Sequence, residues 1–157
     1  MPFSPKPLAT LPPRPWGLSR EHRIRLGGLE LIPDLSGALL APDLKSLLVA
    51  DLHLEKASNM ARRGVHLPPY DTRATLALLE AVIAHALPQR LIFLGDSFHD
   101  DGARERIDGT DLAMLRKVTE RAETIWITGN HDPRPPSDIG GRIASEVALG
   151  DVTLRHE

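Results

Sequence analysis

Three short apolar runs recur along the chain, and each has the length of a buried strand. They are residues 46–50, 90–95 and 124–129, which read "SLLVA", "RLIFLG" and "TIWITG". Continuous apolar runs of about four to eight residues are typical of strands that are covered on both faces, as in parallel sheets. The pattern therefore predicts three central strands of one sheet.

Amphipathic segments between these runs predict helices. Residues 71–87 carry leucines and isoleucines at spacings of three and four, so these side chains share one helix face. Asp71 is the expected N-cap of this helix, and Pro88 ends it. Residues 110–122 repeat the pattern, and residues 55–64 predict a shorter helix. The alternation of strand and helix predicts parallel pairing with right-handed crossovers and an α/β fold.

The flanking segments predict smaller elements. Residues 26–33 and 37–42 are short apolar pieces bounded by Gly and Pro, which indicate edge strands or a hairpin, and residues 146–157 indicate a second hairpin. Residues 1–22 are rich in proline and predict an extended tail. We therefore divide the chain into this tail and one domain over residues 23–157.

Composition narrows the class of protein. A chain of 157 residues with 41% apolar and 25% charged residues is typical of one soluble globular domain. The net charge of −2 gives no general attraction for nucleic acid, so such binding needs a local patch or metal ions. The chain has no cysteine, which excludes disulfides and thiolate metal sites and fits the cytoplasm. No apolar run is long enough for a membrane span.

Polar side chains follow each predicted central strand. Asp51 and His53 come after the first, Asp96 after the second, and Asn130 and His131 after the third. The carboxyl ends of parallel strands lie at one edge of a sheet, where such folds place their sites. We therefore expect these residues to converge.

The residue types at this edge indicate a metal site. Carboxylate, imidazole and amide donors without sulfur suit Mn, Fe, Zn or Mg. Asp51 and His53 are two residues apart, so they project from the same side of an extended chain and can bind the same ion. Asp96 has two oxygens and could bridge two ions. Two ions about 3.5–4 Å apart would clamp a phosphoryl group and supply a nucleophile.

The segments "DLH", "GDSFHD" and "GNHD", in this order at strand ends, resemble the motifs of the calcineurin-like metallophosphoesterases. Longer segments, "VADLHLEKASNMARRGVHLPPYDTRATL", "GNHDPRPP" and "LRHE", resemble the bacterial subfamily associated with DNA ligase and a ligase-linked helicase, often called PdeM. The resemblance covers roughly residues 24–157. It implies an αββα sandwich and a metal-dependent phosphoesterase.

The resemblance also assigns roles to residues. Two divalent ions, with Mn preferred, would be held by Asp51, His53, Asp96, Asn130 and His156. Asp96 would bridge both ions, and His156 would bind the second. His131 would protonate the leaving oxygen or stabilise the transition state, and Asp132 would orient it.

The chain departs from the family pattern in one respect. The family's final G-H-x-H motif, which supplies one ligand to each ion, does not occur before Glu157. We therefore expect a sandwich that is truncated at its C-terminus, binds metal more weakly and exposes a sheet edge. Formation of a homo-oligomer could cover that edge.

Four residues near the motifs are candidates for substrate contacts, and each also has a structural reading. His99 could touch substrate or cap its loop. Arg62 and Arg63 could contact a phosphate backbone or form a solvated helix end, and the same alternatives hold for Arg134.

The function that the sequence favours is hydrolysis of phosphodiesters, with DNA under repair as substrate and DNA ligase and helicase as partners. Two alternatives stay open. The chain could be a catalytically impaired scaffold of a DNA repair assembly, or it could be a phosphomonoesterase or nucleotide phosphatase.

Overall fold

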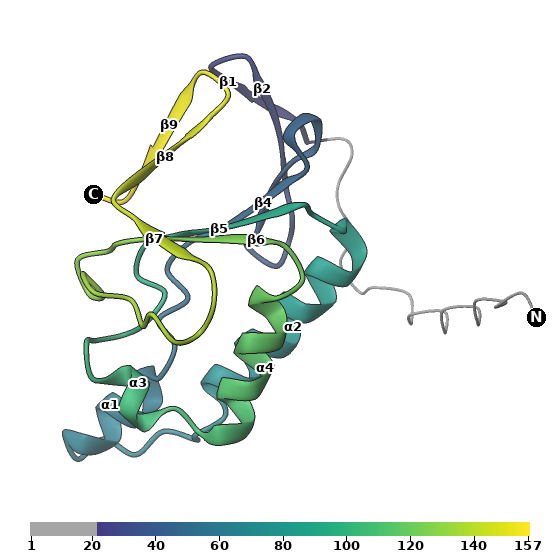
Figure 1. Ribbon diagram of the computed structural model, residues 1–157. Helices are drawn as coiled ribbons and strands as arrows, with labels where there is room; N and C mark the ends of the chain where they lie inside the picture. Colours follow the sequence, from purple (N-terminus) through teal and green to yellow (C-terminus); the bar gives the residue numbers. More distant parts are fainter. Residues whose placement is uncertain (1–21) are drawn as a thin grey trace, which may run out of the picture.

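The computed structural model describes residues 22–157, and a seven-stranded sheet forms its centre (Figure 1). The predicted tail over residues 1–22 lies outside the described residues except for His22. The strands lie in chain order across the sheet. They are β1 (Ile24–Leu26), β2 (Leu29–Pro33), β3 (Leu39–Ala41), β4 (Ser46–Val49), β5 (Arg90–Leu94), β6 (Glu123–Ile127) and β7 (Arg142–Ala144).

The three predicted central strands are present and parallel. Strand β4 pairs with β5, and β5 pairs with β6, with Leu47 opposite Leu91 and Leu91 opposite Thr124. Strands β1 to β4 form an antiparallel meander, which matches the expected hairpin and edge strands. Strand β7, parallel to β6, was not predicted, because its three residues follow a long polar loop and show no apolar run.

Four helices lie on one side of this sheet (Figure 1). They are α1 (Lys56–Arg62), α2 (Asp71–Ala86), α3 (Ala103–Arg106) and α4 (Gly109–Thr119). Leu76 of α2 and Leu115 of α4 are fully buried against the sheet. There Phe93 and Trp126 stack, with ring centroids 3.8 Å apart. None of the helices in residues 22–157 is long and apolar enough to cross a membrane.

The expected N-cap of α2 is placed differently in the structure. Asp71 is the first residue of the helix, and Tyr70 occupies the N-cap position without a side-chain hydrogen bond. The Asp71 carboxylate accepts instead from the backbone N–H of Ala57 in α1, at 2.9 Å. Asp71 therefore joins two helices and does not cap its own, since the start of α1 offers it an unpaired donor.

The opposite face of the sheet is covered by a hairpin of two antiparallel strands, β8 (Glu146–Leu149) and β9 (Val152–Arg155) (Figure 1). Its Leu149 packs with Leu48, Ile92 and Ile125, which are the alternate residues of the central strands. The architecture is therefore the α/β arrangement expected from the sequence, with helices on one face of the sheet and β-structure on the other.

Candidate metal centre

The loops after β4 and β5 run side by side, which brings their polar residues together. The backbone N–H of Asp51 donates to the carbonyl of Gly95 at 3.2 Å, and that of His53 donates to the carbonyl of Asp96 at 3.0 Å. These bonds continue the parallel pairing of the two strands beyond their ends. The predicted convergence of Asp51, His53 and Asp96 follows from this pairing.

Asp51, His53 and Asp96 form a first group of donors. The Nε2 atom of His53 lies 4.0 Å from Oδ1 of Asp51 and 3.9 Å from Oδ2 of Asp96. These separations are too long for hydrogen bonds. They match the spacing of roughly 3–4 Å between neighbouring ligands of one ion when each metal–ligand bond is about 2.1 Å.

Asp96, Asn130 and His156 form a second group. The Nε2 atom of His156 lies 3.0 Å from Oδ1 of Asn130 and 3.5 Å from Oδ1 of Asp96. The Nδ1 atom of His156 lies 3.0 Å from the carbonyl of Leu94, which can only accept. Nδ1 therefore carries the proton of the neutral ring and Nε2 presents a lone pair to two oxygens, an arrangement that a cation would satisfy.

Asp96 belongs to both groups. Its Oδ2 faces His53, and its Oδ1 faces His156. Asp51, Asp96 and His156 each offer a ligand atom within 4.8 Å of the others. The donors of both groups are carboxylate, amide and imidazole atoms, so the residues fit divalent ions of the class expected from the sequence.

Strained backbone marks the same loops. Six non-glycine residues of the described chain have positive φ, and four of them lie in the two loops that carry the metal-binding candidates. These four are Asp51 (φ 53°), His53 (47°), Glu55 (67°) and Asp96 (48°). Left-handed backbone costs an L-residue about 1–2 kcal/mol, and such strain concentrates at functional sites.

Two glycines leave the room that these side chains occupy. A Cβ atom on Gly129 would collide with Asp96 and with the carboxylate of Asp132. A Cβ atom on Gly95 would collide with the ring of His156, and Gly95 also has φ of 81°. The absence of a side chain at these two glycines therefore leaves room for the candidate metal ligands themselves.

Asp132 has a different role from the one that was expected. Its buried carboxylate accepts from the backbone N–H groups of Asp96, Phe98 and Gly129, at 3.0, 3.0 and 3.1 Å. Burial raises the pKa of Asp132, and the N–H donors of Phe98 and other residues oppose that shift. None of the hydrogen bonds found for this carboxylate in residues 22–157 reaches the ring of His131. Asp132 therefore joins the loops after β5 and β6.

His131 is held by the loop after β5. Its backbone N–H donates to Oδ1 of Asp96 at 2.9 Å, and its ring Nδ1 donates to the carbonyl of His99 at 3.2 Å. The ring is exposed, so its Nε2 is accessible from solvent. His99 thus orients the imidazole that Asp132 was expected to orient.

Three imidazoles, those of His53, His99 and His131, lie together beside the first donor group. Each offers a ring nitrogen within 4.8 Å of the other two. Burial lowers the pKa of His99, and the nearby charges of His53 and His131 lower it further. His99 therefore lies at the rim of the centre, although the sequence left its position open.

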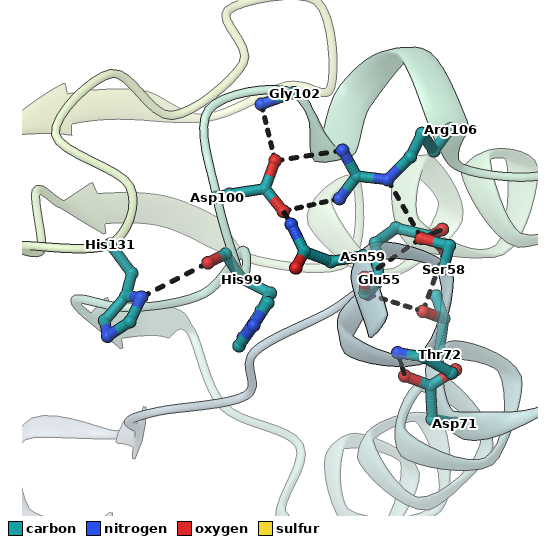
Figure 2. Close-up of polar contacts among 11 residues, drawn as sticks. Glu55, Ser58, Asn59, Asp71, Thr72, His99, Asp100, Gly102, Arg106 and His131 are labelled. Carbon is teal, nitrogen blue, oxygen red and sulfur yellow. Dashed lines mark hydrogen bonds and ion pairs between the residues drawn. The ribbon is translucent and has the colours of Figure 1, made fainter. Parts of the chain in front are cut away.

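A polar network behind His99 was missed by the sequence reasoning (Figure 2). Arg106 donates to both oxygens of Asp100, at 2.9 and 2.6 Å, and Asn59 donates to Asp100 at 2.6 Å. Arg106 also donates to Ser58, which in turn donates to Glu55 at 2.6 Å. The network ties α1 and α3 to the loop after β5. Its partners are up to 48 residues apart in sequence, so no local pattern could reveal it.

The three candidate arginines lie outside both donor groups. Arg62 and Arg63 are exposed at the end of α1, and Arg62 lies beside Gly102. Arg134 is also exposed, but it is paired with Asp101 at 2.6 Å. The structure therefore places these arginines around the centre and not within it.

An α/β sheet with two adjoining groups of oxygen and nitrogen donors at its carboxyl edge defines a candidate metallohydrolase. A model of the calcineurin-like phosphoesterase family matches residues 44–152, which is more than half of the chain. The chain therefore belongs to this family, whose members are metal-dependent hydrolases acting on ester bonds.

A solved structure of the nuclease MPE from Pseudomonas putida is similar to this chain. The TM-score is 0.64 and the sequence identity is 29%, over 82% of this chain and 61% of the nuclease. This chain thus spans less than two thirds of the length of that relative. A search of curated proteins found no match.

Proposed function

We propose that this domain hydrolyses phosphodiester bonds of DNA with the help of two divalent metal ions. The observation that carries the proposal is the position of Asp96, whose two carboxylate oxygens face two separate groups of donors. The similarity to a nuclease supports a nucleic-acid substrate. The mixed oxygen and nitrogen donors favour Mn, and they also suit Fe, Zn or Mg.

One ion would be held by Asp51, His53 and Asp96, and the other by Asp96, Asn130 and His156. When bound, such ions supply Lewis acidity that polarises a phosphoryl group and lowers the pKa of a water molecule. The contribution of the chain is to hold the donors in place. The parallel pairing of the two loops and the carboxylate of Asp132 do this.

His131 is the proposed proton donor to the leaving oxygen. Its ring is exposed beside the centre, and the bond from Nδ1 to the carbonyl of His99 leaves Nε2 free to carry that proton. His99 would contact the substrate at the rim. Arg62, Arg63 and Arg134 would contact phosphates farther along it, with Arg134 leaving its pair with Asp101.

The wider setting follows from the sequence resemblance to the DNA ligase-associated subfamily. We propose a cytoplasmic role in DNA repair, with DNA ligase and helicase as partners. Association with a second copy is also proposed, because the outer strand β7 leaves Ile143 44% exposed at the edge of the sheet.

The direct test is Mn-dependent hydrolysis of an aryl phosphodiester by the chain and by two variants. Asp96→Ala removes a donor from both groups, and His131→Ala removes the proton donor. Each is expected to lose at least about 100-fold in rate. His85→Ala, in the last turn of α2, is the matched control and should keep full activity. Unchanged hydrolysis in either test variant would rule out the mechanism.

Metal content and substrate preference separate the other candidate functions. Elemental analysis that finds two ions per chain supports the hydrolase, whereas no metal together with binding to a ligase would support a scaffold. Faster hydrolysis of an aryl phosphomonoester than of the diester would support a phosphatase acting on terminal phosphates.

A further inference from the structure

Positive charge is concentrated in one segment next to the centre. Residues 56–70 contain Lys56, Arg62 and Arg63 but no Asp or Glu, although the whole chain has a net charge of −2. The segment consists of α1 and the loop that follows it, and we call it the α1 strip. A segment of this composition creates a local positive field on an otherwise acidic protein.

The inner face of α1 is attached to the metal centre. Asn59 donates to Asp100, and Ser58 accepts from Arg106, so the helix is anchored beside His99 (Figure 2). Ala57 and Asn59 are buried. The orientation of the helix is therefore determined, and its charged residues must project outward.

The outer face of the strip is open to solvent. Residues 62–70 are all exposed, and so is Lys56. Tyr70 is 66% exposed, although aromatic side chains generally bury most of their surface. Lys56, Leu67, Pro68 and Tyr70 border one shallow groove. Asp71 also lines it, and its carboxylate accepts from the backbone N–H of Ala57. A cation and an exposed aromatic ring thus face the same space.

Among the described residues, the cations of the strip also lack ion pairs, in contrast to four arginines of the neighbouring helices and loops. Arg73, Arg104, Arg106 and Arg134 each form an ion pair with an aspartate. Within residues 22–157, no such partner is found for the three cations of the strip. Free cations bind phosphates without first breaking an internal pair.

We infer that the α1 strip binds a single strand of nucleic acid next to the metal centre. Its cations contact phosphates, and Tyr70 stacks on a base. Free cations beside an exposed aromatic ring are the two elements that single-strand binding surfaces combine. A duplex buries the faces of its bases, so Tyr70 selects the single strand. The inference rests on the proposed function, and it specifies which form of nucleic acid the domain takes.

The test measures binding of a short oligothymidine by fluorescence anisotropy in EDTA, where no hydrolysis occurs. Arg62→Ala/Arg63→Ala is expected to weaken binding at least about tenfold and to reduce the salt slope by about 1.4. Tyr70→Ala should weaken it about fivefold or more, and Tyr70→Phe should retain it. Binding of a duplex of equal length should be weaker than binding of the single strand.

The matched control is Arg25→Ala/Lys45→Asn. Both residues are exposed cations without an ion pair in the described chain, and Lys45 precedes β4 at the sheet edge opposite the centre. Asn tolerates the left-handed backbone of Lys45. This control should bind oligothymidine as well as the wild type.

Unchanged affinity in either the arginine double variant or Tyr70→Ala would overturn the inference. An equal loss of oligothymidine affinity in the control would also overturn it. So would a wild type that binds no single strand, and the strip would then be assigned to a protein partner. Hydrolysis of an aryl phosphodiester by the wild type is measured separately. A failure there contradicts the proposed function, and a failure of strand binding alone contradicts only this inference.

Discussion

At the scale of single residues, Asp96 is the position on which the candidate metal centre depends. It combines a buried carboxylate, a left-handed backbone and contacts with the residues of two donor groups. Gly129 and Asp132 position Asp96. Gly129 leaves space for the Asp96 side chain, and the Asp132 carboxylate accepts from the backbone N–H of Asp96. Small changes in these two neighbours should therefore act on metal affinity.

Gly129→Ala tests this dependence. The added Cβ collides with Asp96 and Asp132, so we expect Mn affinity to fall at least about tenfold and the free energy of unfolding to fall by about 1–3 kcal/mol. Isothermal titration calorimetry and urea denaturation give the two values. Gly109→Ala is the control, since its Cβ would meet nothing, and it should preserve affinity. Full Mn affinity in Gly129→Ala would contradict the geometry.

At the scale of elements, the short helices hold the loops of the centre in position. Helix α1 and helix α3 meet at Asp100, whose neighbour His99 orients His131. Helix α3 is joined in turn to the loop after β6, because Arg104 binds Asp138. The connections include ion pairs whose arginines differ in burial, which makes their contributions to stability separable.

Arg106→Ala should lower the free energy of unfolding more than Arg134→Ala does. The side chain of Arg106 is 14% exposed, and its removal leaves Asp100 without its two charged hydrogen bonds. We expect the free energy of unfolding to fall by about 1–3 kcal/mol, measured by urea denaturation. Arg134→Ala breaks a pair in which the arginine is 83% exposed, so its cost should stay below about 1 kcal/mol. Equal losses of unfolding free energy in the two variants would contradict the view that burial of the arginine determines the cost.

The ion pair between Arg104 and Asp138 should make the folding stability of the domain depend on pH. Hydrogen bonds from Arg104 lower the pKa of Asp138 from 3.8 to about 2 in the folded chain. The contribution of ionised Asp138 to folding stability is therefore complete above the pKa that this residue has in the unfolded chain, and it is lost as pH falls through about 2. The difference in urea midpoint between the wild type and Asp138→Asn should shrink between pH 5 and pH 2. Asp43→Asn, which removes an exposed carboxylate without an ion pair in the described chain, should show no such trend.

At the scale of the whole molecule, the sheet carries the centre at one edge and two different layers on its faces. Helices α2 and α4 cover one face, and the β8–β9 hairpin covers the other and brings His156 to the centre (Figure 1). The second donor group thus joins strands of the main sheet to the end of the hairpin. Metal binding should therefore stabilise the whole domain and not one loop.

Thermal unfolding with and without Mn measures this linkage. At a concentration 100 times the dissociation constant, an ion that binds only the folded chain adds about 2.7 kcal/mol, which corresponds to a rise of roughly 5–11 °C in the melting temperature. EDTA should reverse the rise. The Asp96→Ala variant should show none, and an equal rise in that variant would place the bound metal elsewhere.

Much of the fold was predictable because its signals are local. Apolar runs revealed β4, β5 and β6, since strands buried on both faces need apolar residues throughout. Strand β7 was missed because it has only three residues, two of them exposed, and follows a polar loop, so it lacks this signature. The prediction that Asp71 caps α2 was wrong because its carboxylate accepts from the backbone N–H of Ala57 in α1, the helix that precedes it in the sequence.

The sequence by itself determined the order of the three central strands and of the helices between them, and it placed Asp51, His53, Asp96, Asn130 and His131 at strand ends, because both depend on spacing along the chain. The tertiary structure alone decided that Asp132 joins loops, that His99 orients His131, and that Arg106 holds Asp100. These contacts depend on backbone torsions in the loops and on the packing of segments that are far apart in sequence, which no local pattern specifies.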